Sequence, residues 1–148
     1  MGIAAWQRVA WTGIGGTLAV AVPDEMRVVV GSHSGVGVFS SETGQRTLQL
    51  NDNDYAWFDQ SRLAILLPDP DGSVETMTCM GIEGGVLPHT TPDGWRCEQT
   101  QEGALLVRGS EQLLIHDSEE LRAMGFSPEG SVFVLATSPN LTIMRRAN

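Results

Sequence analysis

The side chains that could perform chemistry are few, and the first candidates are adjacent in the chain. His116, Asp117 and Ser118 carry the three side-chain types of a hydrolytic triad. Neighbouring residues of a strand point to opposite faces, whereas a triad is assembled in space from separate segments. The spacing therefore favours the end of a strand entering a turn, and we expect a protein that is not an enzyme.

Histidines and acidic turns are the next candidates, as metal ligands. Three histidines, His33, His89 and His116, would be enough to bind a metal ion, but no His-x-His or His-x-x-x-His spacing is present. Segments 51–54 (Asn-Asp-Asn-Asp) and 69–72 (Asp-Pro-Asp-Gly) resemble calcium loops but lack the Glu that closes an EF-hand loop. Because Asp and Asn form ordinary turns by hydrogen-bonding their own backbone, turn formation is the favoured interpretation. We expect no metal and no cofactor.

The four tryptophans, Trp6, Trp11, Trp57 and Trp95, could stack against a sugar. Trp57 and Trp95 fall within predicted strands, which favours packing in the core over ligand contact. Carbohydrate binding by a propeller-like, lectin-like domain therefore stays as the alternative function.

Four similar segments must position these side chains. Each contains an acidic turn, an apolar strand, a polar or Gly/Pro turn and a second strand, and the first strands are predicted near 27–31, 62–67, 104–107 and 131–136. A nearly continuous apolar run is typical of a strand that is covered on both faces. The copies recur every 35 to 40 residues or so, which is about the length of one four-stranded propeller blade.

Segments between the copies are predicted to supply the remaining strands. They are 6–11, 17–22, 46–50, 55–58, 84–87, 95–98 and 121–126. The first strand of the chain would complete the last blade, which leaves few free strand edges. One or two helical turns are expected at 118–124, with Ser118 as N-cap. Val29, Leu66, Leu106 and Val134 are predicted to occupy equivalent buried positions.

Two segments of the sequence resemble a known repeat family. Residues 125–133 (Gly-Phe-Ser-Pro-Glu-Gly-Ser-Val-Phe) and, more loosely, 36–39 followed by 42–45 resemble the strand–turn–strand phrase of WD40-type propellers. The resemblance covers about one blade well, and neither the Gly-His nor the Trp-Asp dipeptide of that family is present. The length of 148 residues is usual for one domain. With the repeat, the resemblance implies one all-β domain, 1–148, with a compact four-bladed propeller-like arrangement of antiparallel strands. The alternative is an irregular β-sandwich or barrel.

Charge indicates the kind of partner. The net charge is −9, from 18 acidic residues and nine arginines, with no lysine. An acidic chain repels phosphate backbones, so nucleic-acid binding is not expected, whereas encounter with a basic protein would be accelerated. The apolar run 9–22 is too short to span a membrane. Cys79 and Cys97 are interpreted as free thiols of a cytoplasmic protein, with one disulfide as the alternative.

These observations together predict a protein-binding module in the manner of bacterial immunity proteins and antitoxins, which would neutralise a basic partner such as a toxin nuclease. Its acidic turns are predicted to lie on two rims, with His33, Asp69, Asp71, Glu111 and turns 12–15, 51–54 and 88–94 on the first. The second rim would carry Asp24, Glu25, Glu42, Asp59, Glu102, Asp117, Glu119, Glu120 and Glu129. The residues predicted to contact the partner are Asp52, Asp54, Asp69, Asp71, Asp93, Glu119 and Glu120.

Overall fold

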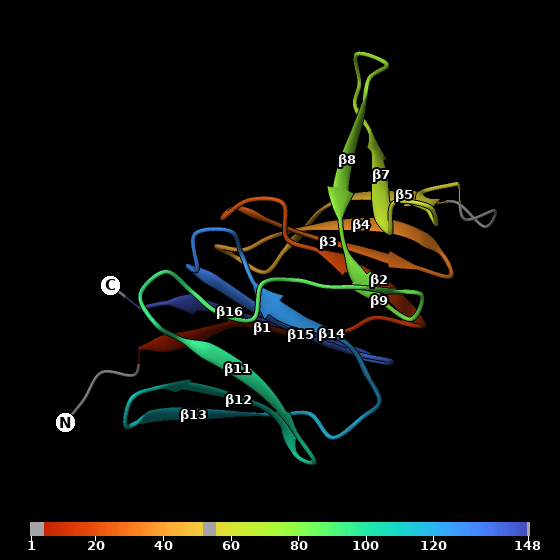
Figure 1. Ribbon diagram of the computed structural model, residues 1–148. Coiled ribbons are helices and arrows are strands. Elements are labelled where there is room, and N and C mark those ends of the chain that lie inside the picture. Colours follow the sequence, from red (N-terminus) through yellow and green to blue (C-terminus); the bar gives the residue numbers. More distant parts are fainter. Residues whose placement is uncertain (1–4, 52–55, 148) are drawn as a thin grey trace.

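The computed structural model describes residues 5–51 and 56–147, and every regular element in them is a β-strand (Figure 1). The strands form four antiparallel sheets, here named A to D. Sheet A has the order β1-β16-β15-β14. Its strands are β1 (Trp6–Gly13), β14 (Leu121–Phe126), β15 (Val132–Thr137) and β16 (Asn140–Arg146).

Sheet B is the largest and has the order β10-β9-β2-β3-β4-β5. Its strands are β2 (Thr17–Ala21), β3 (Arg27–Ser32), β4 (Gly35–Ser40), β5 (Arg46–Asn51), β9 (Met80–Gly81) and β10 (Gly84–Gly85). Sheet C contains β6 (Phe58–Asp59), β7 (Ala64–Pro68) and β8 (Val74–Thr78). Sheet D contains β11 (Arg96–Thr100), β12 (Gly103–Arg108) and β13 (Glu111–His116).

The all-β class and the four predicted hairpins are confirmed. The hairpins are β3–β4, β7–β8, β12–β13 and β15–β16, one for each copy of the repeat. The first strand of the chain does complete the last sheet, because β1 pairs with β16 from Trp6↔Arg146 to Gly13↔Asn140. Ala147 N–H also donates to Ala5 O at 2.9 Å, so the two ends of the described chain lie side by side.

Four expectations differ from the structure. The helical turns at 118–124 are wrong, because Leu121 already begins β14 and pairing with β15 buries Ala123 to Phe126. The strand expected at 84–87 is reduced to two residues, and that expected at 55–58 is also a two-residue strand, β6, which begins only at Phe58. Val29, Leu106 and Val134 are fully buried, but Leu66 is only half-buried and its neighbour Ile65 takes the buried position in β7.

Three hydrophobic clusters hold the sheets together in the order D–A–B–C. Phe133 and Leu106 belong to the cluster between sheets A and D, Val134 and Val28 to that between A and B, and Val29 and Ile65 to that between B and C. Figure 1 shows sheet D at one end of this series and the β7–β8 hairpin projecting at the other. Among the described residues no cluster joins C to D, and the sheets have four, six, three and three strands. The four-bladed ring therefore stays a prediction.

Candidate protein-binding site

Most arginines form ion pairs with carboxylates of the same chain. Six of the nine form ion pairs in the part of the chain that the structure describes. They are Arg27, Arg62, Arg96, Arg108, Arg122 and Arg146, and their partners are Asp24, Asp59, Glu75, Asp93, Glu98, Glu111 and Glu120. A carboxylate that binds an arginine of its own chain contributes little to the attraction of a basic partner.

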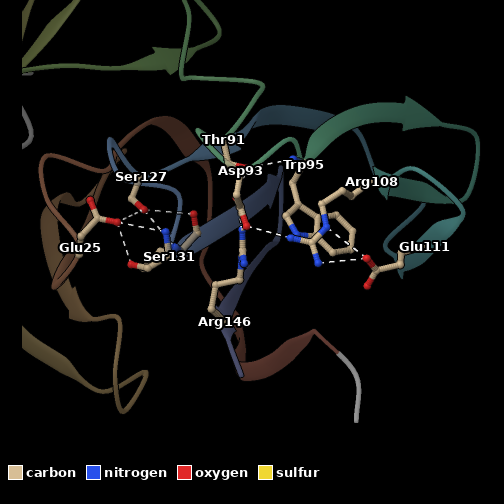
Figure 2. A network of polar contacts seen from close by, with 10 residues as sticks. Glu25, Thr91, Asp93, Trp95, Arg108, Glu111, Ser127, Ser131 and Arg146 are labelled. Carbon is tan, nitrogen blue, oxygen red and sulfur yellow. Dashed lines mark hydrogen bonds and ion pairs between the residues drawn. The ribbon is translucent and has the colours of Figure 1, made fainter. Parts of the chain in front are cut away.

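Asp93, one of the residues predicted to contact a partner, lies at the centre of such a network (Figure 2). Its carboxylate accepts from Arg108 at 2.9 Å, from Arg146 at 2.6 Å and from the Thr91 hydroxyl at 2.7 Å. Hydrogen bonds from Arg146 and Thr91 hold the pKa of Asp93 well below its ordinary value. Arg108 also binds Glu111 at 3.0 Å, so the whole group ties sheet D to the last strand. We interpret Asp93 as structural.

The arginines of this network also pack against two buried tryptophans. Arg146 lies over the Trp6 ring, 4.7 Å from its centroid, and Arg108 lies over the Trp95 ring at 4.8 Å. The two indoles contact edge to face at 5.9 Å. Trp57 is buried as well, so the expectation of core packing holds for Trp57 and Trp95, although both precede a strand and do not lie within one; Trp11 is 57% exposed.

Glu25 forms a second network, which joins sheets A and B (Figure 2). Its carboxylate accepts from the hydroxyls of Ser127 and Ser131 at 2.5 and 2.7 Å and from the backbone N–H groups of Glu129 and Ser131. Burial by itself raises the pKa of Glu25, but these hydrogen bonds outweigh burial and lower it. Glu25 is therefore used between the sheets and not on a free surface.

Asp69 and Asp71 lie in the turn of the projecting β7–β8 hairpin. Both carboxylates accept from the Ser73 hydroxyl, at 3.2 and 2.6 Å, and Asp71 also accepts from the Ser73 N–H. These are turn-forming bonds, and the Ser73 hydroxyl and amide lower the pKa of Asp71. The hairpin separates this pair from the other predicted contact residues. Asp52 and Asp54 lie outside the described residues.

Glu119 and Glu120 are brought together with two further acids in what we name the acidic cleft. It lies between the β11–β12 turn and the segment that connects β13 to β14, encloses about 290 Å³, and is lined by Asp117, Glu119, Glu120 and polar residues of 99–101. Glu102 and His116 line an adjoining depression, which shares Asp117 and Ser118 with the cleft and is counted as part of it here. The Asp117 N–H donates to Glu102 O at 2.9 Å, which fixes the two segments side by side.

Most carboxylates of the acidic cleft are not paired with an arginine in the described part of the chain. Glu102 and Glu119 have carboxylates without a hydrogen bond or ion pair among the described residues, while Glu120 pairs with Arg122. Asp117 Oδ2 accepts from the Thr137 hydroxyl at 2.9 Å, which anchors the cleft to the β15–β16 turn. Four carboxylates are therefore gathered here, and one of them, that of Glu120, pairs with an arginine. Glu102 and Asp117 were expected on a rim, but they were not among the predicted contact residues.

The structure does not assemble the second rim as one surface. The acidic cleft adjoins the β15–β16 turn, because Ser138 N–H donates to Glu120 O at 2.8 Å, whereas Glu25 and Glu129 lie at the β14–β15 turn. These turns are at opposite ends of β15. The difference arises because one strand, β14, lies between Glu120 and Glu129 in the chain. Its first residue, Leu121, pairs with Thr137 and its last, Phe126, pairs with Phe133, so the acids that precede β14 and those that follow it are at opposite ends of sheet A.

Acid is expected to destabilise the protein by protonating the carboxylates of internal hydrogen-bond networks, such as that of Glu25. Because Glu25 has a lower pKa in the folded chain than its ordinary 4.5, the stabilisation is present above that value and is lost as the pH falls through the folded value. Urea midpoints at pH 6 and pH 3.5 measure this loss. Glu25→Gln should reduce the difference between the two pH values, while Glu42→Gln, in an exposed turn, should leave it unchanged. Equal differences in both variants would contradict the assignment.

Neither a metal centre nor a membrane helix is found within 5–51 and 56–147. No three His, Cys, Asp or Glu side chains are grouped to hold a metal ion there, and no helix is long and apolar enough to cross a membrane. Cys79 and Cys97 are both free and buried, and burial raises the pKa of these thiols to about 11 and about 12. Comparison of the chain with protein-family models, curated proteins and solved structures finds no match.

Proposed function

We propose that this protein is a non-enzymatic binding module that recognises a basic protein through its acidic cleft. The observation that carries the proposal is that four carboxylates gather at the cleft and, among the described residues, only one of them, that of Glu120, pairs with an arginine. Asp93 and Glu75 bind arginines of the chain itself, whereas Glu102 and Glu119 bind no internal cation among the described residues. A cluster of unneutralised charge in a concave place focuses the field and accelerates encounter with the opposite charge.

The chemistry of the cleft suits a lysine or arginine side chain. The side chains of Gln99 and Gln101 are exposed, and the cleft is lined by both, so a cation entering it would meet amide and carboxylate oxygens together. A partner that inserts one basic residue and presents others around it would match the net charge of −9. A cytoplasmic immunity or antitoxin role, with a toxin nuclease as the basic partner, is the biological form of this proposal.

A charge-reversal pair tests the proposal. The partner is captured from the source cell's lysate at low salt, identified and purified, and its association rate is then measured. Glu102→Lys with Glu119→Lys should slow association by about tenfold or more, because steering depends on local charge. Glu42→Lys with Glu129→Lys is the matched control, because both pairs change the net charge equally but the control lies outside the cleft.

Three outcomes contradict the proposal. The first is that no basic protein is captured at low salt. The second is that the captured protein binds equally well at 1 M salt, where the Debye length falls to about 3 Å. The third is that the two variant pairs slow association equally, which would show that overall charge matters and the cleft does not.

Carbohydrate binding is the second candidate, and Trp11 favours it. Its indole is 57% exposed on β1, an edge strand of sheet A, where a sugar could stack against the ring. A glycan array tests this function directly. A positive sugar whose binding is lost in Trp11→Ala would support it, and an array without a positive sugar would contradict it.

A further inference from the structure

A pocket between sheets B and C stands apart from the acidic cleft. It encloses about 350 Å³, within the range of small-molecule sites, and most of its lining is apolar. The apolar lining consists mainly of Leu18, Ala19, Trp57, Phe58, Cys79 and Ile82. We propose that this pocket binds a small ligand with an aromatic or branched apolar body and no negative charge.

Close backbone approach shapes the pocket. A Cβ on Gly81 would lie 2.0 Å from Leu18 O, so β9 can approach β2 this closely only with glycine at that position. A Cβ on Gly31 would lie 2.2 Å from the Trp57 ring, so the indole is seated directly on strand β3. The lining is thus held by positions that admit no side chain.

The wall that Cys79 forms is held by a residue with an unusual backbone conformation. Leu63 has φ of 51°, in the left-handed region that bulky residues rarely adopt. Its carbonyl accepts from the Cys79 N–H at 3.2 Å and lies 3.3 Å from the Cys79 thiol, which donates to it. Such conformations cost free energy and persist where surrounding contacts determine them. The two bonds from Cys79 therefore hold the wall in one shape.

The lining determines the class of ligand. Burial raises the pKa of Cys79 to about 11, so its thiol is neutral near pH 7 and acts as part of the apolar wall. Glu83 is the one carboxylate in the lining, and it has no ion pair among the described residues. His33 and Gln60 provide hydrogen-bonding groups. An anion would meet Glu83 and a net charge of −9, whereas a neutral or cationic apolar molecule would not be repelled.

Ile82 forms the exposed lip of the pocket. Its side chain is 57% exposed although its backbone is fixed by a hydrogen bond from its N–H to Leu18 O at 2.9 Å. Val86, four residues later, is 66% exposed but does not line the pocket. These two residues offer a matched pair of substitutions, because both are exposed apolar side chains and only Ile82 is in the lining.

Two related fluorescent probes test the inference. The neutral probe is N-phenyl-1-naphthylamine, and the anionic probe is its 8-sulfonate, which has the same ring system. We expect one molecule of the neutral probe to bind per chain. The affinity of the anionic probe should be lower by a factor of about ten or more, and a factor of ten corresponds to about 1.4 kcal/mol. Near-UV circular dichroism recorded with the titration checks that the protein stays folded.

The lip variants determine whether the probe occupies this pocket. Ile82→Glu should lower the affinity for the neutral probe by about tenfold, because a carboxylate would lie over an apolar ring. Val86→Glu should leave this affinity unchanged. Equal weakening in both variants, tighter binding of the sulfonate, or no saturable binding by the folded protein would each overturn the inference. Any of these results would leave the proposed function of the acidic cleft unaffected.

Discussion

Replacing Trp95 by alanine is expected to lower the free energy of unfolding by about 3–5 kcal/mol, as truncation of a buried aromatic residue does in general. Trp95 is 2% exposed and contacts Trp6 edge to face. The substitution would also remove the ring that faces Arg108 and the surface that seats Arg146. The effect is therefore expected on both the core between sheets A and D and the ion pairs above it. Urea denaturation measures it.

Trp95→Phe is the matched control. The phenyl ring keeps an aromatic face beneath Arg108, and it removes the indole N–H, which has no acceptor among the described residues. We expect this variant to lose much less stability than Trp95→Ala. Comparable losses for both substitutions would contradict the view that ring burial and cation contact dominate here.

The hairpins could be predicted because local chemistry determines them. Turn residues such as Gly35 and Gly109 adopt positive φ, and each stands between two apolar runs. The pairing of the first strand with the last was predictable from the repeat itself, since the fourth copy lacked an outer strand and the chain began with one. Both inferences need only short-range patterns and a count of strands.

The helical turn at 118–124 shows where local chemistry fails. Ser118 followed by two glutamates is typical of a helix start. Pairing between β14 and β15 instead places Met124 opposite Leu135 and Phe126 opposite Phe133, and buries all four side chains. A segment of this length gains little as an isolated helix, so tertiary burial prevails.

The candidate site was predictable only in part. Glu119 and Glu120 were identified from charge, but Asp93 was identified for the same reason and proves to be bound by two arginines. Arg146 is 53 residues from Asp93 in the chain, so no local pattern could indicate that pair. The approach of Glu102 to Asp117 depends on the register of the β12–β13 hairpin, in which Gly103 pairs with His116, and turn composition does not fix that register.

Deletion of residues 1–13 is expected to abolish cooperative folding. It removes every register partner of β16 in strand β1, from Trp6 to Gly13, and it removes the indole beneath Arg146. Loss of the buried Trp6 side chain alone should cost about 3–5 kcal/mol. This is a large part of the about 5–15 kcal/mol that stabilises an ordinary domain. Far-UV circular dichroism and urea unfolding of the shortened chain measure the result.

A circular permutant distinguishes the role of the strand from that of its position in the chain. Trp6 lies opposite Arg146, and Ala147 is hydrogen-bonded to Ala5, so a short Gly/Ser linker can join the two ends. New termini are placed between Gly109 and Ser110, in the exposed β12–β13 turn. Because β1 still covers β16 in this arrangement, we expect the permutant to unfold cooperatively. If the deletion variant folds as well as the permutant, the pairing of first and last strands does not hold sheet A together.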